Sequence, residues 1–252
     1  MKAICVFNQK GGVGKTTTVV NLAAALGLKG KKVLVMDLDP QGNSSSGFGV
    51  DKMNLENTVY DLFINDVKLE DIIYKTEAEN VSIIPSNTSL SGVEVELINT
   101  PSRESVLKNA LEGFEDFDYI IMDCPPSLGF LSINALTAAD SVLIPIQSEY
   151  YALEGVSQLV ETINLVKKSL NKDLEVEGVL ISMFDGRNNL SLEVVEEVKK
   201  YFKNKVFKSI IPRNVRLAEA PSYGESIFDY DSKSKGAVAY EKLAKEIIKN
   251  NK

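Results

Sequence analysis

Short runs of apolar residues recur along the chain, separated by longer amphipathic stretches. The runs are almost continuously apolar rather than alternating, which is typical of parallel strands covered on both faces of a sheet. They predict seven strands, at Ala3–Phe7, Val33–Met36, Val81–Ile84, Tyr119–Met122, Ser141–Ile144, Gly178–Met183 and Val206–Ile211.

Between these runs, apolar residues return at the three- and four-residue spacing of a helix with one buried face. This spacing predicts helices over Lys15–Lys29, Arg103–Leu111, Leu153–Leu170, Leu190–Lys203 and Ala237–Lys249. Alternating strands and helices favour an α/β fold, a doubly wound and mostly parallel sheet flanked by helices, with ligands at the carboxyl ends of the strands. We expect a single domain over residues 1–252, since this length fits one large domain.

The charge of the chain is distributed unevenly. The 28 basic and 35 acidic residues give a net charge of -7, which argues against a generic nucleic-acid binder because duplex DNA repels an acidic protein. Residues 199–252, however, hold 13 basic and 6 acidic residues, a net of +7, whereas residues 1–198 carry a net of -14. The total charge therefore does not exclude a local basic surface.

Other simple classes are excluded more directly. No apolar run approaches the length of about 18 residues that a membrane span requires, and the first residues lead into a glycine-rich loop without room for a signal peptide. The two cysteines, Cys5 and Cys124, lie in apolar runs and the chain has no histidine, so a disulfide framework, a zinc site and a His-based mechanism are not expected. We expect a cytoplasmic protein.

A glycine-rich loop between the first strand and the first helix carries the strongest signal. Glycines in this setting let backbone amides curl inward around an anion, and the helix N-terminus adds partial positive charge. We expect Lys15 to contact the β- and γ-phosphates of a nucleotide and the Thr16 hydroxyl to bind Mg²⁺. The predicted nucleotide-binding residues of the loop are Lys10, Gly11, Gly12, Val13, Gly14, Lys15, Thr16 and Thr17.

Acidic residues follow two of the predicted strands. Asp37 and Asp39 end the second strand, and Asp123 ends the fourth. A lone aspartate at a strand end usually forms a turn, but two such clusters downstream of a phosphate loop favour Mg²⁺ binding, directly or through water. The polar, Gly/Ser-rich stretch of residues 40–56 follows the first cluster and is expected to be functional. No general base of high pKa is evident in the sequence. We therefore expect slow hydrolysis of the bound nucleotide, driven by positioning and electrostatics.

The loop departs from the general pattern in a specific way. Gln9 stands where a glycine is expected, and Lys10 adds a second lysine. The sequence Lys-Gly-Gly-Val-Gly-Lys-Thr-Thr resembles the deviant Walker A motif of the ParA/MinD superfamily, in which the first lysine reaches across a dimer to the partner's ATP. The resemblance to the chromosomal ParA proteins called Soj extends over four further segments, Asp37–Asn43, Asp123–Gly129, Gln147–Gly155 and Ile211–Ser222.

This resemblance implies roles for individual residues. Lys10, Lys15 and Asp39 would be catalytic, with Asp39 in switch I orienting the attacking water. Asp123 would be the Walker B acid, and Asp37 would support the metal shell. Gly12 lies where the family's dimer interface is tight. The Pro-Arg-Asn segment of the family lies against the adenine, which nominates Pro212 and Asn214; a strand terminator remains the alternative for Pro212.

The resemblance also implies a function. It is that of a slow Mg²⁺-ATP-dependent ATPase that dimerises with ATP, binds double-stranded DNA nonspecifically in that state, and drives chromosome or plasmid segregation with a ParB-type stimulatory partner. It would associate with the nucleoid when ATP is bound. Arg187 and Arg216 match the family's DNA-binding arginines. Further candidates are the other basic residues of the C-terminal part, Lys199, Lys200, Lys203, Lys205, Lys208, Arg213, Lys233 and Lys235.

Three alternatives belong to other classes. A MinD-like ATPase inserts a C-terminal amphipathic helix into lipid, but here Val238, Leu243, Ile247 and Ile248 are expected to pack on the sheet, so no membrane partner is expected. An iron–sulfur ATPase needs an exposed Cys-x-x-Cys, and a bacterial tyrosine kinase needs a terminal tyrosine cluster; neither pattern is present. The phosphate loop begins at residue 10, so operator-specific DNA binding by a preceding helix-turn-helix is not expected.

Overall fold

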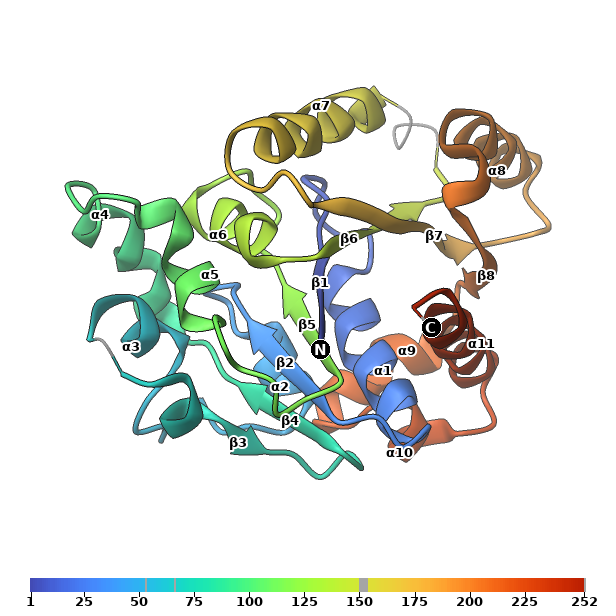
Figure 1. The fold of residues 1–252 in the computed structure, drawn as a ribbon. Coiled ribbons are helices and arrows are strands. Elements are labelled where there is room, and N and C mark those ends of the chain that lie inside the picture. Colours follow the sequence, from blue (N-terminus) through green and yellow to red (C-terminus); the bar gives the residue numbers. More distant parts are fainter. Residues whose placement is uncertain (53, 66, 150–153, 252) are drawn as a thin grey trace.

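In the described residues, eight strands form one sheet in the order β3-β4-β2-β5-β1-β6-β7-β8 (Figure 1). The computed structural model describes residues 1–52, 54–65, 67–149 and 154–251. Neighbouring strands are parallel except for the β3–β4 pair, so the predicted mostly parallel sheet is confirmed. The strands are β1 Lys2–Val6, β2 Val33–Asp37, β3 Tyr74–Lys75, β4 Val81–Ile84, β5 Tyr119–Asp123, β6 Ser141–Gln147, β7 Glu175–Phe184 and β8 Val206–Pro212.

Helices connect the strands and cover both faces of the sheet, which confirms the predicted fold class (Figure 1). Four of the five predicted helices are present nearly as expected, and the stretch 103–111 divides into a 3-10 turn followed by one short helix. The helices are α1 Lys15–Gly27, α2 Asn43–Gly47, α3 Val59–Ile64, α4 Val93–Glu96, α5 Val106–Ala110, α6 Phe130–Ala138, α7 Glu154–Ser169, α8 Asn189–Phe202, α9 Val215–Glu219, α10 Ile227–Asp231 and α11 Lys235–Asn250.

The central strand β1 shows how the two faces are divided. Because successive side chains of a strand point to opposite faces, Ala3 and Cys5 join the cluster packed under α3, α5, α6, α7 and α8, while Ile4 and Val6 join the cluster packed under α1 and α11. The strand is buried on both sides, which explains its continuously apolar sequence.

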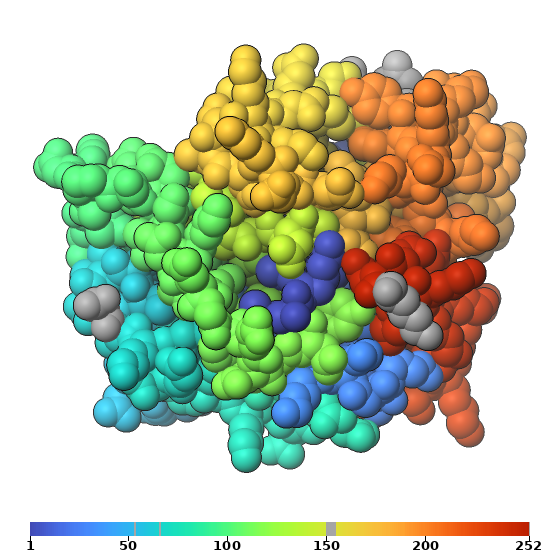
Figure 2. Space-filling view, in the orientation of Figure 1, coloured from blue at the N-terminus to red at the C-terminus, as the bar shows by residue number. Residues whose placement is uncertain are grey.

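Both ends of the described chain meet at one carboxylate. Glu177 in β7 accepts a hydrogen bond from the Asn251 side chain at 2.6 Å and lies 3.8 Å from the Lys2 ammonium. Figure 2 shows the blue N-terminal residues enclosed between green middle segments and the red C-terminal segment. The first and last described segments of the chain therefore lie next to each other at Glu177, although they are far apart in the sequence.

Helix α11 packs on the sheet mainly as expected. Leu243 and Ile247 are fully buried, and Ile248 packs partly against the same cluster. Val238 was expected to be buried with them, but this expectation is wrong: it is 43% exposed because it lies on the rim of a cavity beside β8. Among the described residues, no helix is both long and apolar enough to cross a membrane.

Candidate active site

The loop between β1 and α1 has the backbone of an anion site. Gly12 and Gly14 have φ values of +74° and +89°, which residues with a Cβ adopt only under strain. Gly14 is the N-cap of α1 and caps it with no side chain, so the first amides of the helix are left for a ligand. Lys15 is only 7% exposed and donates from Nζ to the Lys10 carbonyl at 3.2 Å.

Burial lowers the pKa of the Lys15 ammonium, and the nearby carboxylates of Asp123 and Asp39 oppose this effect. A partly desolvated cation that still has carboxylates beside it gains strongly from a phosphate, since Coulomb attraction increases in a low dielectric. The loop therefore combines a positive side chain with free backbone donors.

Two carboxylates lie side by side beneath this loop. Asp37 on β2 and Asp123 on β5 are register partners, and both are fully buried. Burial raises the pKa of Asp37 to about 6; for Asp123, burial together with the charge of Asp37 raises the pKa to about 7. Asp37 accepts hydrogen bonds from the Ser45 amide and hydroxyl at 2.8 and 2.7 Å, and from the Asp39 amide at 3.2 Å.

Asp123 has one oxygen paired and one unpaired. Its Oδ2 accepts from the Ser44 hydroxyl at 2.7 Å, whereas Oδ1 is buried without a hydrogen-bond partner in the described part of the chain. The nearby Thr16 hydroxyl lowers the pKa of Asp123. An orphaned carboxylate oxygen beside a threonine hydroxyl fits Mg²⁺, which takes few protein oxygens and completes its shell with water and phosphate.

Asp37 differs from Asp123 in this respect, because both of its oxygens already accept hydrogen bonds. It therefore fits a supporting role better than direct coordination. Within residues 1–52, 54–65, 67–149 and 154–251, no group of three or more His, Cys, Asp or Glu residues could hold a metal by itself. A metal here would depend on Thr16 and on the ligand's own oxygens.

The raised pKa of Asp123 predicts a pH-dependent stability of the ligand-free protein. A carboxyl whose pKa is higher in the folded state stabilises the fold at low pH and loses this contribution as pH rises through about 7. We expect Asp123→Asn to raise the free energy of unfolding by roughly 1–3 kcal/mol at pH 8, with a smaller gain at pH 5. Urea unfolding of both proteins between pH 5 and pH 8 measures this difference in the free energy of unfolding. Asp116→Asn, at an exposed site, should show no such trend.

Asp39 lies at the wall of the cavity that the loop encloses. It is 8% exposed, and its Oδ1 accepts from the Gln41 amide at 2.9 Å. The cavity has a volume of about 300 Å³. Its lining residues are Gly11, Gly12, Gly14, Lys15, Thr16, Thr17, Asp39, Asn43, Pro126 and Met183.

A second cavity of about 370 Å³ adjoins the first and shares Gly14, Thr17 and Met183 with it. Pro212 and Asn214 line this second cavity, and Pro212 is also the last residue of β8. The remaining lining is mostly apolar, with Ile211, Val215, Leu217, Ala218 and Tyr240 among its residues. A polar loop joined to an apolar hollow fits a molecule with phosphates at one end and a base at the other.

Comparison with known proteins agrees with this geometry. A family model described as an AAA domain matches residues 1–176. The sporulation initiation inhibitor protein Soj of Bacillus subtilis is 58% identical over 250 residues, 99% of each chain, and the chromosome partitioning protein ParA of Myxococcus xanthus is 52% identical over 251 residues, 99% of this chain and 89% of that protein. The chain belongs to the ParA/Soj family.

A solved structure extends the comparison. Cobyrinic acid a,c-diamide synthase from Mycobacterium smegmatis, with bound ADP and magnesium, superimposes with a TM-score of 0.87 at 37% identity and covers 99% of this chain and 95% of that one. The ParA/Soj-family chain is accordingly a P-loop ATPase. Its loop, Asp39 and the Pro-Arg-Asn segment line two adjoining cavities.

The structure brings together most of the predicted site residues of this ParA/Soj-family ATPase, but not the two arginines. Arg187 follows β7 and Arg216 lies in α9, and neither lines the two cavities. Tyr150, Tyr151, Ala152 and Leu153, which belong to a segment of the family resemblance, lie outside the described residues.

Sequence reasoning missed three residues that shape the site. Ser44 and Ser45 lie in α2, within the polar stretch of residues 40–56; both are fully buried, and their hydroxyls donate hydrogen bonds to Asp123 and Asp37. Met183 lines both cavities. The serines had a signal in the run Ser44-Ser45-Ser46 directly after an acidic cluster, because hydroxyls are natural donors to carboxylates.

Proposed function

We propose that this ParA/Soj-family ATPase is a switch that dimerises with Mg²⁺-ATP, binds double-stranded DNA without sequence preference in that state, and drives chromosome or plasmid segregation with a ParB-type stimulatory protein. The observation that carries the proposal is the phosphate cavity lined by Lys15, Thr16 and Asp39, in a chain 58% identical to Soj. The protein is cytoplasmic in this proposal and nucleoid-associated with ATP.

Nucleotide binding follows from the two cavities. The backbone amides of residues 11–17 and the Lys15 ammonium hold the phosphates, and the apolar cavity beside Pro212 and Asn214 receives the adenine. Mg²⁺, which accompanies ADP in the related M. smegmatis structure, supplies further charge neutralisation when bound. In this chain Thr16 and Asp123 would hold it, directly or through water.

Hydrolysis depends on positioning. The Asp39 carboxylate is fixed by the Gln41 amide at the cavity wall, where it accepts a hydrogen bond from the attacking water and orients it. Lys15 stabilises the charge that develops on the phosphate oxygens. Lys10 contributes from the partner subunit, so that full neutralisation requires a dimer.

Gly12 is suited to a close approach between two subunits. A Cβ built there meets no atom within 4 Å in the described part of the chain, apart from its chain neighbours, and its φ of +74° disfavours any side chain. A side chain at this position would project away from the chain, into the space that a partner subunit occupies in the proposed dimer. The same feature leaves room for the partner's Lys10.

Three arginines lie close to the carboxyl ends of β7 and β8, where the Arg213 amide donates to the Phe184 carbonyl at 3.0 Å. Each has a carboxylate partner: Arg187 pairs with Asp185 at 2.8 Å, Arg213 with Glu149 at 3.4 Å and Arg216 with Glu219 at 2.9 Å. Because exposed ion pairs contribute little stability, DNA phosphates can replace these carboxylates at small cost.

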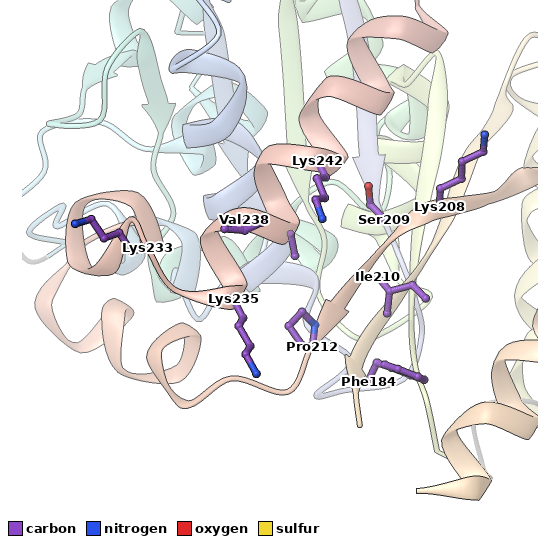
Figure 3. A pocket seen from close by; sticks show the side chains of 10 residues that line it. Phe184, Lys208, Ser209, Ile210, Pro212, Lys233, Lys235, Val238 and Lys242 are labelled. Atoms are coloured by element: carbon purple, nitrogen blue, oxygen red, sulfur yellow. The ribbon is translucent and has the colours of Figure 1, made fainter. Parts of the chain in front are cut away.

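A lysine-lined cavity of about 430 Å³ extends the basic surface (Figure 3). Its four lysines come from β8, from the turn before α11 and from α11 itself; they are Lys208, Lys233, Lys235 and Lys242. Pro212 lines both this cavity and the apolar one. The basic residues therefore lie next to the nucleotide site, where two copies in a dimer would present a doubled positive surface.

A DNA titration tests the proposal. Binding to random-sequence duplex DNA is measured with ATP, with ADP and without nucleotide, at several salt concentrations. We expect binding only with ATP and a steep salt dependence, since each phosphate contact releases about one counterion. Binding that is equal in all three states, or ATP-dependent co-sedimentation with liposomes but not with DNA, would reject the proposal.

Arg216→Ala separates DNA binding from dimerisation. A dimer that loses two phosphate contacts should bind DNA about tenfold more weakly, and the logarithmic salt slope should fall by about 2. The ATP-dependent dimer fraction, measured by light scattering, should be unchanged. Lys31→Ala, which removes an exposed ion pair with Asp118 at the opposite ends of the strands, is the control. An equal loss of dimer and DNA binding would contradict separate sites.

A further inference from the structure

Met183 has an unusual backbone for a methionine inside a strand. Its φ is +51°, in the left-handed region that disfavours residues with a Cβ, and the register between β7 and β8 shifts between Ile181 and Phe184. Irregularities of this kind redirect side chains and occur next to active sites. The local geometry of β7 is therefore disturbed at the point where it reaches the two cavities.

The disturbance changes the face to which Met183 points. Along β7, Val179 and Ile181 belong to one core cluster and Leu180 to the other, as regular alternation requires. Alternation would place Ser182 beside the loop and Met183 on the opposite face. Instead, Ser182 and Met183 both line the apolar cavity.

Met183 lies at the junction of the two cavities, because it lines both of them. Its Cε is 3.9 Å from the position that a Cβ on Gly14 would occupy. The preceding residue fixes this placement, since the Ser182 hydroxyl donates to the Val13 carbonyl at 2.7 Å. The Met183 carbonyl accepts from the Ser148 hydroxyl at 3.4 Å. These two hydrogen bonds hold the backbone at residues 182–183, from which the thioether extends to the phosphate loop.

We infer that Met183 is a nucleotide-contact residue that selects for the nucleoside: its thioether packs against the sugar and base of a purine nucleotide whose phosphates lie in the loop. A thioether is apolar and polarisable, so it packs well on a flat aromatic ring. It offers no hydrogen-bond donor to a phosphate. The contact therefore discriminates between a nucleoside triphosphate and its phosphate chain alone. The inference rests on nucleotide binding at this site and is independent of DNA binding.

Two substitutions at this position test the inference. Met183→Gly removes the side chain while keeping a residue that tolerates positive φ, and Met183→Leu keeps an apolar side chain of similar size. Competition against a fluorescent ATP analogue gives affinities for ATP and for inorganic tripolyphosphate, in the presence of Mg²⁺. We expect Met183→Gly to weaken ATP binding at least tenfold and tripolyphosphate binding less than twofold, whereas Met183→Leu stays within about threefold for both.

Ser102→Gly is the matched control, because Ser102 also has a positive φ, +56°, at an exposed site that lines neither cavity. It should leave both affinities unchanged. Unchanged ATP affinity in Met183→Gly, or an equal loss for ATP and tripolyphosphate, would overturn the inference. Wild-type protein that binds ATP without binding DNA would reject only the proposed DNA-binding switch, so the two failures are distinguishable.

Discussion

Asp39→Ala should bind ATP and dimerise normally yet hydrolyse ATP at least about 100-fold more slowly than the wild type. The carboxylate lines the phosphate cavity and is held by the Gln41 amide, so it has a fixed direction toward the ligand. Lys15 and the loop amides, which hold the phosphates, are untouched by the substitution. Phosphate release in a single turnover at saturating ATP measures hydrolysis, and light scattering measures dimerisation.

Asp39→Asn refines this experiment, because its amide oxygen still accepts a hydrogen bond from water but carries no charge. An intermediate rate would indicate that orientation and charge both contribute. Asp229→Asn, at the start of α10, serves as the control for removing an aspartate elsewhere. An Asp39→Ala protein that stays monomeric with ATP, or hydrolyses ATP at the wild-type rate, would contradict the role assigned to Asp39.

The sequence predicted those parts of the fold that depend on local pattern. Continuous apolar runs identify the strands of a sheet covered on both sides, and the burial of β1, β2 and β5 accounts for them. The carboxyl ends of neighbouring parallel strands meet at one edge of the sheet. The residues that follow β1, β2 and β5 were therefore expected to lie close together. Asp37 and Asp123 are indeed register partners, and the loop after β1 lies beside them.

What the sequence did not predict depends on contacts between distant segments. Helices α2 and α3 have five and six residues, too few to show a helical period, and α2 is held by bonds from Ser44 and Ser45 to strand-end carboxylates. Met183 points into the site because of a backbone irregularity that no local pattern records. Val238 fits the apolar face of α11 but reaches the rim of a lysine-lined cavity.

Lys15→Ala should have the largest effect on nucleotide affinity. Hydrogen bonds from a charged donor to phosphate are stronger than those from a neutral donor, and the Lys15 ammonium is buried, where its attraction to phosphate is stronger still. Its removal should therefore weaken ATP binding about 100-fold or more. Dimerisation and DNA binding should disappear with it, since both require ATP in the proposed switch. Titration with a fluorescent ATP analogue measures the loss.

Lys10→Ala is the matched comparison, because it removes the other lysine of the same loop. The Lys10 backbone carbonyl accepts a hydrogen bond from the Lys15 ammonium at 3.2 Å, and this carbonyl remains in the alanine variant. If Lys10 acts on the partner's nucleotide, Lys10→Ala should bind ATP within about threefold of the wild type yet fail to dimerise and hydrolyse. Equal losses of ATP affinity in the two variants would instead place both lysines on the nucleotide of their own subunit, and the requirement for a dimer would then need another cause.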